Sequence, residues 1–290
     1  MKKILLLTDL SEASHNALRF ARSFFSDTLV DFHLLCVHPV ESNSQHNPLL
    51  VVKATRSAYA DQLDGVVTEL RREATNDWHT FRSSACPGQL IEVVQRSLEA
   101  EQYDFVVIGP QPEDTDDPFG NSAIALVHQL RANVLVVPRH SALQRPVRQV
   151  VLAADFALLK NAKLLGPVKE LVALKGATLT LLTIDTPNKP VVNMEQEAHI
   201  RQFLMPIEPS IAQLKASSAR LGIDTYLAAH PVDLLITIPK YNDRTERLTS
   251  SRVTRLWAFT PAVPLLTLYD DNSNDQPQSV NELSTVDFAL

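Results

Sequence analysis

Residues 3–14, KILLLTDLSEAS, decide the fold, because they read as a buried strand followed by a short loop and the start of a helix. The consecutive apolar residues before Thr8 are typical of a strand that is buried on both faces. Ser11 then offers an N-cap oxygen, and apolar residues recur at helical spacing from Ala13 to Phe24. The chain therefore opens with the first part of a strand–helix–strand unit.

The same alternation continues to residue 138. Parallel strands need crossover helices, and these helices cover both faces of the sheet. The sequence therefore predicts an α/β domain with a doubly wound, parallel five-stranded sheet. Beyond the first strand and helix, the predicted strands lie at 29–37, 78–85, 104–108 and 134–137, and the predicted helices at 54–75, after Gly88 and at 121–131.

The pattern begins again after a polar link at residues 139–146. Residues 148–154 end in Asp155 as residues 3–8 end in Asp9, so we interpret the chain as an internal duplication. The predicted elements of the second copy are a helix from Asp155, a strand at 177–184, a mostly helical stretch at 194–221 that breaks near Pro206 and Pro209, and strands at 232–238 and 264–268. We expect two domains, 1–140 and 147–270, followed by a disordered polar tail at 271–290.

The second copy is shorter than the first. Asp9 and Asp104 lie 95 positions apart, whereas Asp155 and Asp233 lie 78 apart. Only residues 230–232 remain between the stretch TYLAA and Asp233, and a parallel crossover needs about a dozen residues. We therefore expect the second domain to be truncated by one crossover helix, the one that corresponds to residues 88–101. Its sheet is then smaller, with a third strand that is lost, displaced or merged with the next.

The composition fits two globular domains in a reducing compartment. The 290 residues are 45% hydrophobic and 21% charged, which is enough for two cores. The formal net charge of -6 argues against a nucleic-acid or membrane-surface binder, because no basic excess can neutralise phosphates. Cys36 and Cys86 are too few for a disulfide framework, and the first apolar run is too short for a signal peptide or a membrane span. We therefore expect a cytoplasmic protein.

The order and spacing of these features resemble the universal stress protein family in its tandem form. The resemblance is carried by residues 3–14, by the strand that ends at Val37, by the stretch 104–109, by Gly120-Asn121-Ser122 at a helix start, by the strand that ends at Pro138 and, in the second copy, by residues 251–268. It implies two domains of the adenine-nucleotide α-hydrolase-like fold in tandem. It also implies that the last strands of the two copies, 134–137 and 264–268, pair antiparallel about a pseudo-two-fold axis, as in the homodimer of single-domain members.

The resemblance implies a stress-response binding or regulatory module that performs no catalysis. Its protein partner is unknown, and two such chains could form a further homodimer. No metal-ligand spacing, nucleophile elbow or glycine-rich pyrophosphatase loop accompanies the first strand, so we expect neither a metal site nor an enzyme. Nucleotide sensing is the alternative function.

A ligand site is implied for the first copy. Family members that bind ATP carry an Asp after the first strand, a Val after the second, and a Gly-x2-Gly-x9-Gly-Ser/Thr loop after the fourth that holds the phosphates. The implied cofactor is ATP with Mg²⁺. Pro112 stands where the middle glycine belongs, the loop is two residues shorter, and Asn121 replaces the Ser or Thr. The residues at the matching positions are Asp9, Val37, Gly109, Gly120, Asn121 and Ser122.

Other interpretations of these residues stay open. The loop after Gly109 carries carboxylates that would repel a triphosphate unless a divalent metal intervened, and prolines that lack the amide donors of a phosphate cradle. A solvated acidic loop is therefore an alternative to a phosphate site. Asp9 could instead accept hydrogen bonds from loop amides and fix the turn. The loop residues concerned are Pro112, Glu113, Asp114, Asp116, Asp117 and Pro118.

The second copy has no glycine in the loop after Ile238, and glycine is what allows a backbone to approach phosphate closely. We interpret Asp155 as structural and the basic run of this loop as a solvated face. We therefore expect the second copy to serve as the built-in partner of the first. The basic residues are Lys240, Arg244, Arg247 and Arg252.

Overall fold

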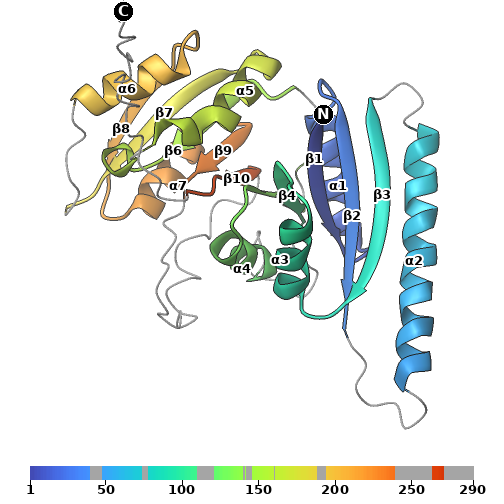
Figure 1. Ribbon diagram of the computed structural model, residues 1–290. Coiled ribbons are helices and arrows are strands. Elements are labelled where there is room, and N and C mark those ends of the chain that lie inside the picture. Colours follow the sequence, from blue (N-terminus) through green and yellow to red (C-terminus); the bar gives the residue numbers. More distant parts are fainter. Residues whose placement is uncertain are drawn as a thin grey trace, which may run out of the picture.

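The computed structural model describes residues 1–39, 48–73, 78–109, 121–139, 141, 146–159, 161–187, 194–238 and 263–270, without the side chains of 48–56, 121, 124 and 194. One sheet of ten strands runs through the molecule in the order β3-β2-β1-β4-β5-β10-β9-β6-β7-β8 (Figure 1). The N-terminal half contributes β1 to β5 and the C-terminal half β6 to β10. The acidic loop, the loop after Ile238 and the polar tail lie outside the described residues.

The elements of the N-terminal half follow the predicted order closely. They are β1 (Lys2–Thr8), α1 (Glu12–Phe24), β2 (Val30–His38), α2 (Pro48–Glu73), β3 (His79–Pro87), α3 (Leu90–Ala100), β4 (Phe105–Ile108), α4 (Asn121–Gln129) and β5 (Val134–Val136). Those of the C-terminal half are β6 (Gln149–Ala153), the 3-10 turns η1 (Phe156–Leu158) and η2 (Ala162–Leu165), α5 (Gly166–Lys175), β7 (Thr178–Asp185), α6 (Met194–Leu204), β8 (Ser210–Lys215), α7 (Ala219–Ala229), β9 (Leu234–Thr237) and β10 (Leu265–Thr267).

The strands within each half are parallel, and the halves meet through their last strands. β5 and β10 run antiparallel, with Leu135 opposite Leu266 at the centre of the pair. The strand order of one half is the mirror of the order in the other about this pair. The α/β fold class and the antiparallel pairing of the two last strands are therefore confirmed.

The prediction that the second copy lacks a crossover helix is wrong. Its sheet has a third strand, β8, which pairs with β7, and the crossover helix α7 leads from β8 to β9. α7 has 11 residues, as does its counterpart α3. The shortening lies one crossover earlier, because α2 has 26 residues and α6 has 11.

Two sequence signals were misread in that segment. Pro206 and Pro209 follow the last residue of α6 and precede β8, so they separate a helix from a strand instead of kinking one long helix. The stretch TYLAA at 225–229 is the last part of α7, so the crossover helix includes this stretch and does not have to fit between it and Asp233. Likewise, Asp155 is followed by two short 3-10 turns, and the α-helix begins only at Gly166.

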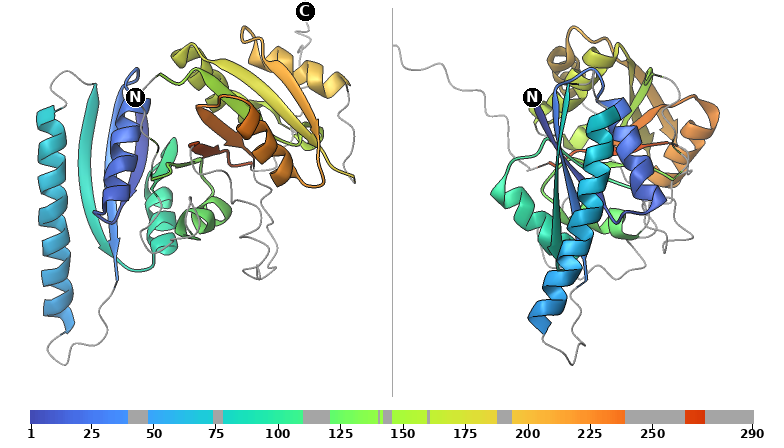
Figure 2. Two further views of the ribbon diagram at one scale, coloured as in Figure 1. Left: turned by 180° about the vertical axis from the view of Figure 1, so that it is seen from behind. Right: turned by 90° about the vertical axis from the view of Figure 1, so that its right-hand side faces the viewer.

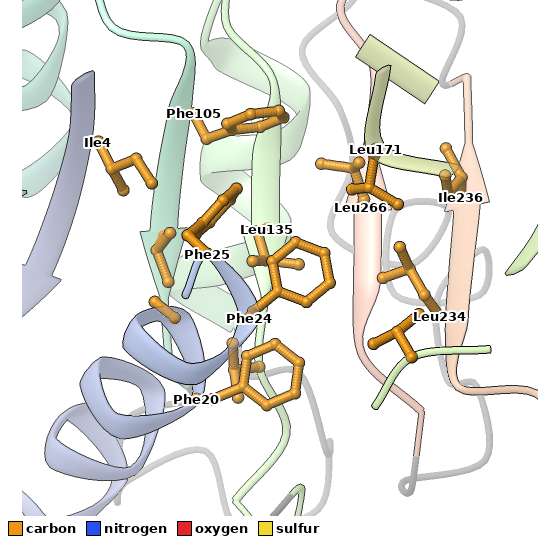
Figure 3. Packing of buried hydrophobic residues seen from close by; sticks show 14 of the residues in the cluster. Ile4, Phe20, Phe24, Phe25, Phe105, Leu135, Leu171, Leu234, Ile236 and Leu266 are labelled. Carbon is orange, nitrogen blue, oxygen red and sulfur yellow. The ribbon is translucent and has the colours of Figure 1, made fainter. Parts of the chain in front are cut away.

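Helices cover both faces of the sheet, as Figure 2 shows from behind and from the side. One buried cluster packs α1, α2, α5 and α6 on one face, and a second cluster packs α3, α4 and α7 on the other. The first cluster is continuous across β5 and β10. In Figure 3, Phe20, Phe24 and Phe25 lie beside Leu135, and Leu171, Leu234 and Ile236 lie near Leu266. Among the described helices, none has the length and hydropathy needed to cross a membrane.

Ion pairs join the two halves at the amino ends of the first strands. Lys175 Nζ lies 2.7 Å from Asp27 Oδ2 and 5.3 Å from the centre of the Phe24 ring. Lys2 Nζ lies 2.8 Å from Glu170 Oε2. Both lysine side chains are largely buried, so these ion pairs connect the two halves in addition to the apolar core that they share.

Candidate functional site

The carboxyl edge of the N-terminal half brings several predicted site residues to one side of the sheet. Asp9 follows β1, Val37 lies near the end of β2, and Gly109 follows β4. β1 lies between β2 and β4, so the chain changes direction across the sheet there, and open α/β folds bind ligands at such a point. α4 begins at Asn121 at this edge, with Ser122 in its first turn. Gly120 lies outside the described residues, as does the side chain of Asn121.

Asp9 holds the turn between β1 and α1. Its Oδ1 accepts the amide of Ser11 at 2.9 Å, and Leu10 between them has a left-handed φ of 65°. Thr8 Oγ1 accepts the amide of Leu10 at 3.0 Å and lies 2.9 Å from Ser14 Oγ. The alternative interpretation of Asp9, that it accepts from a loop amide, therefore describes a bond that the structure contains.

Gly109 is required by helix packing. A Cβ atom built on it would lie 2.6 Å from the carbonyl oxygen of Ala13, in the first turn of α1. The absence of a side chain lets α1 approach the end of β4. The close packing of α1 on the end of β4 therefore explains Gly109 without any ligand.

His38 follows Val37 at this edge, and a lone histidine there is interpreted from the sequence as a polar loop residue, whereas the structure places it at the buried end of β2. It is 2% exposed and stacks on Tyr59 of α2 with ring centroids 4.9 Å apart. Its Nε2 is buried and has no hydrogen-bond partner among the described residues. The available signal was strand alternation, because His38 continues the inward series of Phe32, Leu34 and Cys36.

The cysteines near this edge are free thiols. Burial, with the nearby charge of Asp9 and then Cys86, raises the pKa of Cys36 to about 11. A thiol with this pKa stays protonated, so Cys36 behaves as core packing. In the described part of the chain, no group of three metal-ligating side chains comes together.

The corresponding edge of the C-terminal half differs. Asp155 precedes a 3-10 turn instead of an α-helix, and Asp185 Oδ2 accepts Gln213 Nε2 at 2.7 Å. The basic residues Lys240, Arg244, Arg247 and Arg252 lie outside the described residues. At the position that corresponds to Gly109, after β9, this edge has Ile238 in place of a glycine.

A second polar cluster lies on the face of β2 and β3 that α3 packs against. His33 contacts Tyr103 Oη through Nδ1 at 2.6 Å and Ser84 Oγ through Nε2 at 2.7 Å. Arg82 bonds Glu101 at 2.5 Å and Tyr103 Oη at 3.2 Å. Asp31 is the last member of the cluster, and its Oδ2 accepts a hydrogen bond from Arg82 Nε at 3.2 Å.

This polar cluster shifts the titration of its members. Burial, with the Arg82 charge, lowers the pKa of His33 to about 4. Hydrogen bonds from Lys3 and Arg82 lower the pKa of Glu101 to about 2. Burial and the bond to Glu101 raise the pKa of Tyr103 to about 12. At neutral pH the cluster therefore holds a neutral imidazole, a carboxylate and a protonated phenol.

Comparison with solved structures shows that both halves of the chain together share a known fold. A universal stress protein from Archaeoglobus fulgidus superposes with a TM-score of 0.70 at 14% identity, covering 92% of this chain and 97% of that one. A functionally unknown protein from Pseudomonas aeruginosa PAO1 gives 0.59 at 14% identity, covering 92% of each chain. A putative universal stress protein from Pseudomonas aeruginosa UCBPP-PA14 gives 0.58 at 14% identity, with 92% and 93% covered.

The N-terminal half also matches by sequence. The model of the universal stress protein family matches residues 1–138, which contain β1 to β5. No curated protein matches the chain. Residues 1–138 of this chain are therefore similar in sequence to the universal stress protein family, and the chain as described shares the fold of solved universal stress proteins.

Proposed function

We propose that the protein is a stress-response binding module of the cytoplasm, with one ligand edge and without catalysis. Residues 1–140 and 147–270 are its two domains in this proposal, and the second is the fixed partner of the first. The observation that carries it is the asymmetry of the two carboxyl edges. Asp9, Val37 and Gly109 lie at the carboxyl ends of β1, β2 and β4, beside the buried His38. At the second edge, Asp155 precedes a 3-10 turn and Ile238 stands after β9 in place of a glycine.

The joined sheet supports the role of the second domain. β10 covers the edge of β5 that would otherwise be open, and an open strand edge is a template for association with other chains. The covalent partner therefore removes the need for a second chain at this position. A further homodimer would have to form on another surface. A protein partner would bind differently to the first domain with and without its ligand.

An adenine nucleotide is the alternative ligand, at the first edge only. The start of α4 faces this edge, where a helix N-terminus favours a phosphate. Asp9, Val37, Gly109 and Ser122 would hold the nucleotide, with Gly120 and Asn121 completing the loop and Mg²⁺ offsetting nearby carboxylates. The departure at Pro112 predicts weaker binding than an intact glycine loop would give.

Calorimetry with ATP, with and without Mg²⁺, tests the alternative. If the first edge binds nucleotide, Asp9→Ala abolishes the heat and Asp155→Ala, the matched change in the second domain, leaves it unchanged. Absence of heat at millimolar ATP excludes nucleotide sensing and leaves the binding module to be tested with other ligands. Hydrolysis of ATP by pure protein, lost in Asp9→Ala, would overturn the statement that no catalysis occurs.

A further inference from the structure

The polar cluster around His33 has one consistent direction of proton donation. Tyr103 Oη donates its proton to Glu101 Oε2 at 3.0 Å. Because the Tyr103 oxygen has given its only proton to this bond, it must accept from both Arg82 and His33. The proton of the neutral imidazole therefore sits on Nδ1, where it points at Tyr103.

This direction fixes the role of Ser84. With its proton on Nδ1, His33 presents the lone pair of Nε2 to Ser84 Oγ at 2.7 Å. The hydroxyl must then donate to the imidazole, which pulls the proton away from Oγ. A hydroxyl that donates to a histidine held by a third group has the arrangement of an activated nucleophile. Glu101 acts through Tyr103, so both are positioning residues in this chain.

We propose that Ser84 is a reactive serine that accepts a small acyl group from an activated ester, with His33 as the general base. Oγ attacks the ester carbonyl carbon as its proton moves to His33 Nε2. The bond from that carbon to the leaving oxygen then breaks, and the acyl group stays on Oγ. The leaving group departs either as an alcohol that takes the proton from His33, or as an alkoxide or phenoxide while His33 releases that proton to water. No oxidation or reduction takes place, and no further reactant is needed.

The position of Ser84 sets the class of acyl donor. β3 is the edge strand of the sheet, and the Ser84 and His33 side chains are only half-buried. The Arg82 side chain is 39% exposed on the same face, and in this proposal its positive charge stabilises the developing oxyanion. We therefore expect the site to accept small and unhindered acyl groups, in a slow, single acylation.

Acetylation by p-nitrophenyl acetate tests the proposal on the full chain. We expect one acetyl group per chain, placed on Ser84 by peptide mass spectrometry, and none there in Ser84→Ala. Ser83 provides the matched control, because it is the next serine of β3 but bonds Asp64 at 2.9 Å. Ser83→Ala therefore leaves the rate unchanged. His33→Gln lowers it by about 100-fold, the scale of general base catalysis.

Two further measurements separate an activated serine from an exposed one. Tyr103→Phe removes the acceptor of the Nδ1 proton and is expected to lower the rate about 10-fold, the effect of losing one hydrogen bond that orients the imidazole. The wild-type rate should stay constant above pH 5 and fall by half near the His33 pKa of about 4. Acetylation only on lysines, a rate that rises steadily toward alkaline pH, or equal labelling of Ser84 in His33→Gln would each overturn the proposal.

Discussion

At the scale of single residues, His33 links the polar cluster to the stability of the fold. Its pKa is about 4 in the folded protein, against an ordinary value of 6.5. Between these values the unfolded chain binds more protons than the folded one, so stability falls as the pH is lowered through this window. The groups that face His33 are Arg82, Asp31, Glu101 and Tyr103.

The first prediction follows from this linkage. Between pH 7 and pH 5, His33 should cost the wild type about 2 kcal/mol of unfolding free energy. His33→Gln keeps two hydrogen-bonding atoms but has no proton to gain. Its unfolding free energy should therefore fall by about 2 kcal/mol less than that of the wild type over the same pH range. Urea denaturation of both proteins at the two pH values measures the difference. Equal losses in the two proteins would contradict the assigned pKa of His33.

Gly109 provides a second prediction at this scale. Gly109→Ala sets a methyl group 2.6 Å from the Ala13 carbonyl oxygen and should destabilise the fold by about 1–3 kcal/mol. Gly65 is the control, because a Cβ there meets nothing within 4 Å and alanine is the better helix former. Gly65→Ala should therefore stabilise by up to about 1 kcal/mol. If chemical denaturation gives both variants the same stability, the packing role of Gly109 is wrong.

At the scale of elements, the sequence predicted well wherever apolar periodicity was strong. Residues 4–7 of β1 and all of β4 are uninterrupted apolar runs that belong to buried strands, and Ser11 caps α1 as expected. The edge strand β8 was missed because its residues are all at least partly exposed, so no apolar run marks it. A strand of this kind is recognised by alternation alone, and Ser210–Lys215 is too short for that signal to outweigh a helical interpretation.

The candidate site was predictable only where the backbone dictates it. Asp9, Val37 and Gly109 could be placed at one edge, because carboxyl ends of neighbouring parallel strands meet there. The bond from Asp9 to the Ser11 amide and the stacking of His38 on Tyr59 depend on local side chain geometry. The polar cluster joins β2, β3 and the segment after α3, which only the sheet register brings together.

A third prediction tests the crossover helix that the sequence did not reveal. Ser218 caps α7, and its Oγ accepts the amide of Leu221 at 3.2 Å. Ser218→Ala should lower the unfolding free energy by about 1 kcal/mol, the usual effect of losing an N-cap. Ser217→Ala changes the exposed residue before it and should have no effect. Two variants that unfold at the same urea concentration would argue against a helix that begins at this position.

At the scale of the whole molecule, the two halves are joined symmetrically but covered unequally. The outer strand β3 has His79, Phe81 and Ala85 buried beneath the long helix α2. The opposite outer strand, β8, has no buried residue beside the short helix α6. The C-terminal half is therefore thinner at its free edge and depends more on the seam that it shares with the N-terminal half.

That seam leads to the last prediction, which concerns cooperativity. Leu266 of β10 is 1% exposed and lies opposite Leu135 of β5, so Leu266→Ala opens a cavity where the halves meet. We expect a loss of about 2–5 kcal/mol. Because one apolar cluster extends through both halves, the loss should appear equally in the two halves.

Hydrogen exchange at increasing urea, followed by mass spectrometry, resolves the halves. Peptides from β1 and β6 should share one unfolding midpoint in the wild type, and Leu266→Ala should move both midpoints together. Ile211→Ala, at a position 45% exposed on β8, is the matched control and should move neither. If the β6 midpoint fell while the β1 midpoint stayed, the halves would be separate folding units, and the second domain could not act as a rigid partner of the first.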